Sequence, residues 1–107
     1  MSENNRLIWL NGNITPVEDA KINVLAPTSQ FGANVFEGIR CYWSNDNNQL
    51  YGFRLKEHYE RLARSINMLR LDFEMSMEEC EKAMKDVVRA NGYKQDIAVR
   101  QTVFVDG

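Results

Sequence analysis

VFEGIRCYW, residues 35–43, has the composition of a strand, but it carries a glutamate, a glycine and an arginine within an apolar run. Side chains along a strand point alternately to its two faces. One face therefore holds Val35, Glu37, Ile39, Cys41 and Trp43, and it is apolar apart from the glutamate. The other face holds Phe36, Gly38 and Arg40. A ring, a gap and a cation are an unusual combination for a core, and they fit the wall of a ligand site.

Turn-forming residues on both sides of this strand predict two hairpins. Before it, residues 7–10 and 14–17 flank Asn11-Gly12-Asn13, and Asn-Gly adopts the positive φ angles that a tight hairpin turn requires. After it, the polar run at residues 45–48 forms a turn that leads into a short return strand at residues 50–53. The central strand is therefore expected to pair with the segment that follows it.

Two helices and a last strand are expected in the second half of the chain. Apolar residues recur at steps of four and three across residues 55–69, which is typical of an amphipathic helix. A second helix begins at the capping box Ser76-Met77-Glu78-Glu79 and ends at Gly92. Residues 97–105 alternate again as a strand, whereas residues 18–34 have no regular period and are expected to form a surface loop. This order predicts an α+β domain, with two helices packed on an antiparallel or mixed sheet.

Composition limits the classes of partner. A length of 107 residues fits one domain, residues 1–107. Thirteen basic and 15 acidic side chains give a net charge of −2, so we expect neither a nucleic acid nor a membrane as partner. Cys41 and Cys80 lie among apolar neighbours, which favours buried, reduced thiols. With no apolar leader or membrane-spanning stretch in the sequence, the expected compartment is the cytoplasm.

The residues available for chemistry are mainly arginines. His58 is the only histidine, so neither a Ser-His-Asp triad nor a multi-histidine metal site can be built. Arg40 and Arg100 lie in the middle of predicted strands, beside small neighbours that leave room for a ligand. Two guanidinium forks on one sheet could bind the distal acid group of a dicarboxylate. Alternatively, both face solvent or pair with acidic groups such as Glu37 or Asp96.

A third arginine lies on the first predicted helix. At 100° per residue, His58, Arg61 and Ser65 form one polar flank beside the apolar stripe of this helix. Such a flank is either an ordinary solvated surface or a site for an anion, and the spacing alone does not separate these interpretations.

Three stretches of the chain together resemble a known family. They are IWLNGNITPVEDAKINVLAPTSQFGANVFEGIRCY, FRLKEHYERLARSINMLRLD and VRQTVF. They resemble the N-terminal small domain of the class IV, fold-type IV aminotransferases, and most closely the branched-chain amino acid aminotransferase group. The resemblance covers nearly the whole chain, and FEGIR followed by HxxRL is its specific part. It implies amino-group transfer between leucine, isoleucine or valine and 2-oxoglutarate, with pyridoxal 5'-phosphate as cofactor.

The resemblance also implies roles for matching residues. The arginine of HYERL, here Arg61, holds the cofactor phosphate in the family. The Phe36 and Gly38 positions line the substrate pocket. Arg40 and Arg100 match the pair that recognises the distal carboxylate of glutamate. The ring, the gap and the cation of the central strand then suit a pocket that accepts both an aliphatic side chain and a carboxylate.

Three positions depart from the branched-chain pattern. Phe31 stands where these enzymes often have a tyrosine that reaches the pocket of the partner subunit, and it is expected to take that substrate-binding place without the hydroxyl. Ala98 replaces a second tyrosine, and Gln101 replaces a proline. D-amino acid aminotransferase and aminodeoxychorismate lyase are therefore alternatives within the class. A non-catalytic binding or dimerisation module that keeps the fold is an alternative outside it.

In this family the lysine that forms the Schiff base lies in a larger C-terminal domain, so the resemblance assigns no catalytic residue to this chain. Residues 1–107 are accordingly expected to be inactive on their own. The expected partners are the amino acid and 2-oxo acid substrates, the C-terminal domain of the same enzyme, and a second subunit in a homodimer. The guanidinium groups of Arg40, Arg61 and Arg100 are expected to converge on one cavity.

Overall fold

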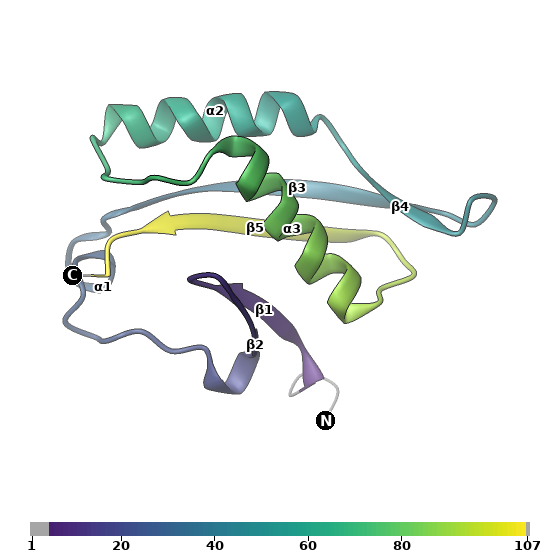
Figure 1. Cartoon of the computed structure of the whole chain (residues 1–107), viewed down its shortest axis with the longest axis horizontal. Helices are drawn as coiled ribbons and strands as arrows, with labels where there is room; N and C mark the ends of the chain where they lie inside the picture. The colour runs from purple at the N-terminus through teal and green to yellow at the C-terminus, as the bar shows by residue number, and fades with distance from the viewer. Residues whose placement is uncertain (1–4, 107) are drawn as a thin grey trace.

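The structure is a computed structural model, and it describes residues 5–106. In chain order its elements are β1 (Leu7–Leu10), β2 (Asn13–Pro16), the short 3₁₀ helix η2 (Val17–Asp19), α1 (Pro27–Phe31), β3 (Asn34–Ser44), β4 (Gln49–Gly52), α2 (Leu55–Met68), α3 (Met77–Asn91) and β5 (Ile97–Phe104) (Figure 1). The predicted α+β class is confirmed, as are both hairpins, both long helices and the last strand.

The strands form two antiparallel sheets rather than the single sheet that the sequence predicts. β1 pairs only with β2, whereas β3 lies at the centre of a three-stranded sheet in the order β4-β3-β5. The first hairpin is instead attached to α3, because the side-chain amide of Asn91 donates to the carbonyl of Leu7 at 2.8 Å and its oxygen accepts from the Leu7 N–H at 2.9 Å. A side chain thus satisfies backbone groups that a neighbouring strand would otherwise bind.

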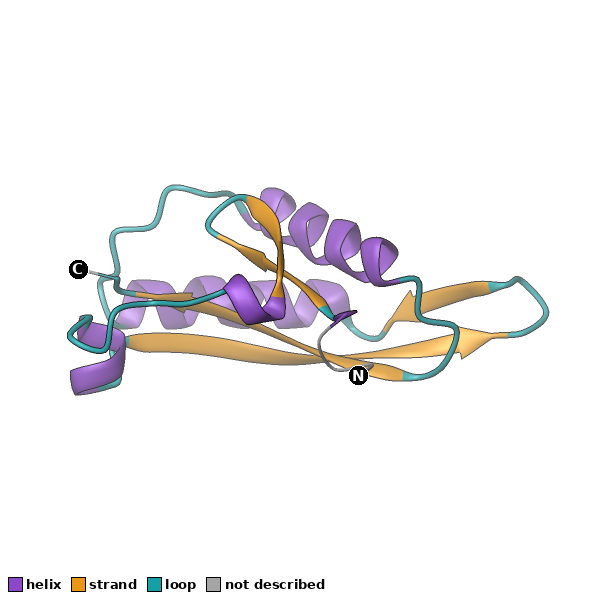
Figure 2. Ribbon diagram, turned by 90° about the horizontal axis from the view of Figure 1, so that it is seen from below, coloured by secondary structure: helices purple, strands orange, loops and turns teal. Residues whose placement is uncertain are grey.

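The three-stranded sheet is covered by helices on one face only. The domain measures 44 × 34 × 18 Å, and its short dimension corresponds to two layers. Figure 2 shows α2 and α3 on the same side of β3 and β5. The core between these layers consists of Ile39, Cys41, Tyr59, Leu62, Ile66, Cys80 and Val103. Both cysteines are free and buried, as predicted, and no helix within residues 5–106 is long and apolar enough to cross a bilayer.

Alternation along β3 follows the prediction. Glu37, Ile39 and Cys41 are buried against the helices, while Phe36, Gly38, Arg40 and Tyr42 are exposed on the opposite face. On β5 the exposed residues are Ala98, Arg100 and Thr102. The face that carries the predicted ligand wall is therefore the face that no helix in the described chain covers.

The helix α1 was not predicted, because its five residues are too short to produce a helical period in the sequence. Pro27 occupies its first turn, where a missing N–H is tolerated, and Gly32 ends it in the left-handed conformation at φ 64°. This helix brings Phe31 to the surface, where the residue is 83% exposed.

Candidate functional site

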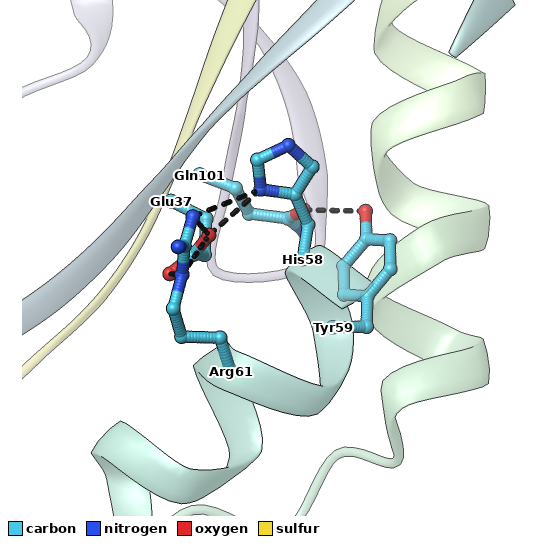
Figure 3. A network of polar contacts seen from close by, with 5 residues as sticks. All are labelled: Glu37, His58, Tyr59, Arg61 and Gln101. Atoms are coloured by element: carbon cyan, nitrogen blue, oxygen red, sulfur yellow. Dashed lines mark hydrogen bonds and ion pairs between the residues drawn. The ribbon is translucent and has the colours of Figure 1, made fainter. Parts of the chain in front are cut away.

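Glu37 holds two side chains of α2 from the central strand. Glu37 as a whole residue is only 5% exposed. Arg61 donates from Nε to Oε2 at 2.9 Å and from Nη2 to Oε1 at 2.8 Å, as Figure 3 shows. Nδ1 of His58 lies 2.7 Å from Oε1 and donates its proton there, since an ionised carboxylate only accepts. A buried carboxylate requires partners of this kind to offset its lost hydration.

These contacts fix the charges of the group. Hydrogen bonding from Arg61 is the main reason why the pKa of Glu37 lies below its ordinary value, with His58 adding to the effect and burial opposing it. The same hydrogen bond raises the pKa of Arg61. Near neutral pH, Glu37 is therefore an anion and Arg61 a cation.

Arg61 keeps part of its guanidinium available. Of five N–H donors in an arginine, one on Nε and one on Nη2 face Glu37, which leaves three that do not. The side chain is 60% exposed. An arginine held along one edge and open along the other can bind a phosphate or carboxylate bidentately. The polar flank of α2 thus carries a cation that Glu37 anchors and that has donors left for a ligand. The Ser65 hydroxyl on this flank makes no hydrogen bond to another residue within residues 5–106.

The uncovered face of the sheet brings four other predicted residues together. Arg40 lies opposite Ala98 and Arg100 opposite Gly38, so the two arginines are diagonal neighbours on one face. The guanidinium of Arg100 lies 3.8 Å from the ring centroid of Phe36, a cation–π contact. A Cβ added to Gly38 would meet no atom within 4 Å. The ring, the gap and the cations predicted for this wall therefore lie on one exposed surface.

The alternative in which Arg40 and Arg100 pair with acidic groups is not what the structure contains. Glu37 binds Arg61 on the opposite face, and Asp96 accepts a hydrogen bond from the backbone N–H of Trp43 at 2.8 Å. Neither arginine takes part in an ion pair within residues 5–106. Both residues are exposed, and the guanidinium of Arg100 stacks on Phe36.

The expected convergence of Arg40, Arg61 and Arg100 on one cavity is wrong for this chain. Arg61 binds Glu37, whose side chain lies on the helix-covered face of β3. Arg40 follows Glu37 by three residues on the same strand, and an odd spacing in a strand puts two side chains on opposite faces. A cavity of about 1130 Å³ lies between β1, α3 and β5, and of the predicted site residues only Arg100 borders it. The candidate site is therefore not this cavity.

The two groups of arginines approach each other at one edge of the sheet. β5 pairs with β3 over residues 34–41, but β4 joins the other side of β3 only from Cys41 onward. Within residues 5–106, no strand pairs with that other side of β3 at residues 34–40. Figure 1 shows α2 beside this free edge. A ligand lying across it could contact Arg61 from one side and the Phe36 face from the other.

The contacts of Glu37 with Arg61 and His58 are the part of the candidate site that the sequence prediction missed. The sequence identifies Glu37 as the one polar residue on an apolar strand face and offers it as a partner for Arg40 or Arg100, but not for Arg61. The signal in the sequence is its isolation, because a carboxylate among core residues requires a cation or several hydrogen-bond donors as partners. The side of the sheet that α2 covers identifies which cation this is.

Acid is expected to weaken the fold through Glu37, whose carboxylate faces Arg61 and His58. Because its pKa in the folded chain is below the ordinary 4.5, the ionised form stabilises the fold above that value, and this contribution is lost as the pH falls through the lowered pKa. The difference in urea midpoint between the protein and its Glu37→Gln variant should shrink from about pH 6 to about pH 3. The exposed Glu60→Gln is the control. A difference that stays constant over this range would contradict the expectation.

Comparisons of the sequence and of the fold both relate this chain to aminotransferases. The family described as amino-transferase class IV matches residues 34–107. A probable branched-chain-amino-acid aminotransferase of Aquifex aeolicus (strain VF5) is 35% identical over 96 residues, which cover 90% of this chain and 31% of that protein. The crystal structure of the branched-chain aminotransferase from Thermoproteus uzoniensis with norvaline is 42% identical, with a TM-score of 0.88 over 95% of this chain and 34% of that one.

A second solved structure carries a different ligand. It is the T.th. branched-chain amino acid aminotransferase complexed with N-(5'-phosphopyridoxyl)-L-glutamate, which is 41% identical, with a TM-score of 0.85 over 94% of this chain and 33% of that one. This chain therefore spans about a third of the length of the relatives it matches. The family match covers more than half of the chain and includes β3, α2 and β5, which carry the candidate site. On this evidence, the resemblance found in the sequence is confirmed, and the chain belongs to the class IV aminotransferase family.

Proposed function

We propose that the protein containing this chain is a pyridoxal-phosphate-dependent branched-chain amino acid aminotransferase, of which residues 1–107 form the N-terminal domain. It moves an amino group between leucine, isoleucine or valine and 2-oxoglutarate. The observation that carries this proposal is the pairing of two features at one sheet edge. These are the open guanidinium edge of Arg61, held on Glu37, and the exposed wall of Phe36, Gly38 and two arginines.

The residues present fit a phosphorylated cofactor. A phosphate needs several N–H donors and a positive charge, and Arg61 offers three free donors on an exposed, permanently charged fork. Pyridoxal phosphate, when bound, supplies the electron sink for amino-group transfer. The ligand of the T.th. relative joins a phosphate to a glutamate in one molecule, which supports the proposal that both groups lie within reach of this edge.

The substrate wall has features for two kinds of side chain. The Phe36 ring and the open space at Gly38 suit the aliphatic side chain of leucine, isoleucine or valine. Arg40 and Arg100 suit the distal carboxylate of glutamate, since two guanidinium forks can bind it with several charge-assisted hydrogen bonds. The stacking of Arg100 on Phe36 places its charge beside the apolar surface before a ligand arrives. The same wall could thus bind the branched-chain amino acid in one half of the transfer and glutamate in the other half.

We further propose that this face is covered in the complete protein. Phe36, Tyr42, Tyr51 and Phe53 are all exposed, and a large exposed apolar surface of this kind is typical of an interface. The C-terminal domain of the same enzyme is the proposed cover, and Phe31, which projects from α1, is proposed to reach the pocket of a second subunit in a homodimer. We propose the cytoplasm as the compartment, with which two buried cysteines that form no disulfide are consistent.

The proposal is tested on the complete protein incubated with pyridoxal phosphate. We expect a near-visible absorption band that borohydride abolishes, and amino-group transfer to 2-oxoglutarate from leucine, isoleucine and valine. A protein that is inert with all three but active with D-alanine would instead be a D-amino acid aminotransferase. A protein with no such band would be a binding or dimerisation module. Turnover by residues 1–107 alone would contradict the division of roles between the domains.

Enlarging Gly38 is expected to change substrate use without harming the fold. Because a Cβ at this position meets nothing within 4 Å, Gly38→Val should fold as well as the wild type. The added methyl groups occupy the proposed pocket, so the KM for leucine should rise roughly tenfold. Gly52→Ala is the contrasting variant, since its Cβ would lie 2.7 Å from Cδ2 of Leu55 and should destabilise the protein. An unchanged KM for leucine in the folded Gly38→Val variant would remove Gly38 from the pocket.

A further inference from the structure

We propose that Glu37 is a positioning residue for the cofactor: it holds the guanidinium of Arg61 by one edge, so that the opposite edge is presented to the phosphate of pyridoxal phosphate. This inference rests on the proposed function, and it assigns a role to a side chain that touches neither cofactor nor substrate. Its action is exerted through Arg61 alone.

The geometry of the pair supports this role. Two hydrogen bonds, from Nε at 2.9 Å and from Nη2 at 2.8 Å, join the guanidinium to the two oxygens of the carboxylate and fix its plane. An arginine on an exposed helix face otherwise samples many rotamers, and binding an anion must then restrict them. With the fork already oriented by Glu37, less of that restriction remains when the phosphate binds.

Glu37 is itself held in place. It lies on the central strand of the sheet, is 5% exposed, and receives a further hydrogen bond from His58. Its cross-strand neighbour Gln101 accepts from the hydroxyl of Tyr59 at 2.7 Å (Figure 3). The side-chain amide of Gln101 also donates to the carbonyl of Cys80 at 2.8 Å. Glu37 is thus bonded to α2, and its neighbour on β5 is bonded to both helices, so the two strands are tied to α2 and α3 beside the anchor. Because Glu37 is held in the core, its hydrogen bonds restrict the rotamers of the exposed Arg61 side chain.

The negative charge of Glu37 has an opposing effect, because it repels a phosphate. Two features limit this repulsion. The carboxylate lies behind the guanidinium as seen from its free edge, so the nearest charge to the phosphate is positive. The Arg61 side chain is also 60% exposed, and water screens the longer-range repulsion strongly. The orienting effect of Glu37 should therefore outweigh its repulsion of the phosphate. The two effects can be told apart, because loss of orientation weakens the binding of pyridoxal phosphate when the carboxylate is removed, whereas loss of repulsion strengthens it.

The test measures affinity in the complete protein, by spectroscopic titration with pyridoxal phosphate and, separately, with pyridoxal, which lacks the phosphate. Glu37→Ala should weaken binding of pyridoxal phosphate about tenfold and leave binding of pyridoxal unchanged. Glu37→Gln, which keeps one acceptor for Arg61 and nearly the same volume, should show a smaller loss in the same direction. In an Arg61→Ala background, Glu37→Ala should cause no further loss, because the two side chains act as one unit. Glu60 is an exposed glutamate on α2, next to Arg61, and Glu60→Ala should leave the affinities for pyridoxal phosphate and for pyridoxal unchanged.

Three results would overturn the inference: tighter or unchanged binding of pyridoxal phosphate in both Glu37 variants, an equal loss for pyridoxal and pyridoxal phosphate, or a full further loss in the Arg61→Ala background. If Glu37→Ala does not fold, as judged by thermal unfolding without cofactor, the comparison of Glu37→Gln with the wild type decides the matter. A wild-type protein that binds no pyridoxal phosphate at all would contradict the proposed function itself, which separates that failure from a failure of the role of Glu37.

Discussion

Replacement of Arg61 by alanine is expected to weaken binding of pyridoxal phosphate to the complete protein roughly 100-fold. The free edge of this guanidinium can make two charge-assisted hydrogen bonds to a phosphate, and hydrogen bonds to charged groups contribute about 1.5–3 kcal/mol each. Their loss corresponds to two or more factors of ten in the dissociation constant. The dissociation constant is measured by titration of the cofactor absorption band.

Two further variants make this result specific. Arg61→Lys keeps the charge but has no fork to bind Glu37 and the phosphate together, so its affinity should fall between those of the wild type and Arg61→Ala. Arg64→Ala removes an exposed arginine from the same helix and should change the affinity little. If Arg61→Ala and Arg64→Ala bind the cofactor equally well, Arg61 is not the phosphate ligand.

Removal of the two arginines on the uncovered sheet face should separate acidic from aliphatic substrates. The double variant Arg40→Ala/Arg100→Ala is expected to lower kcat/KM for glutamate roughly 100-fold, because the distal carboxylate loses its charged partners. The value for leucine should change only a few-fold, since its side chain has no charge to bind. Initial rates with each amino donor measure both values.

The matched control for this pair is Arg89→Ala, which removes an exposed arginine from α3 and should affect neither substrate. An equal loss for glutamate and leucine in the double variant would show that the arginines support the fold or the cofactor rather than the carboxylate. An unchanged value for glutamate would place its distal carboxylate elsewhere.

Much of the fold could be predicted, because its longer elements have clear periods. The step of two along β3 identified its faces, and the step of three and four located α2. The capping box at Ser76 and the glycine at position 92 marked the two ends of α3. By contrast, α1 is too short for a period, and the separation of β1 and β2 from the main sheet depends on a contact between Asn91 and Leu7 that are 84 residues apart. Such contacts leave no local pattern.

The site was predicted in part. Period-two alternation was sufficient to place Phe36, Gly38 and Arg40 on one exposed face, but the roles given to them come from the family resemblance. The pairing of Glu37 with Arg61 could not be predicted in the same way, since it depends on which sheet face α2 covers and how the helix is rotated on it. The position of α2 on the sheet also decides that Arg61 lies on the opposite face from Arg40 and Arg100.

The most direct test of the central claim is the crystal structure of the complete protein with N-(5'-phosphopyridoxyl)-L-glutamate. We expect phosphate oxygens within hydrogen-bond distance of the free guanidinium edge of Arg61, with Nε still bound to Glu37. We also expect the distal carboxylate of the glutamate at Arg40 and Arg100, so that the ligand crosses the free edge of β3. A phosphate held elsewhere, with Arg61 facing solvent, would contradict this account.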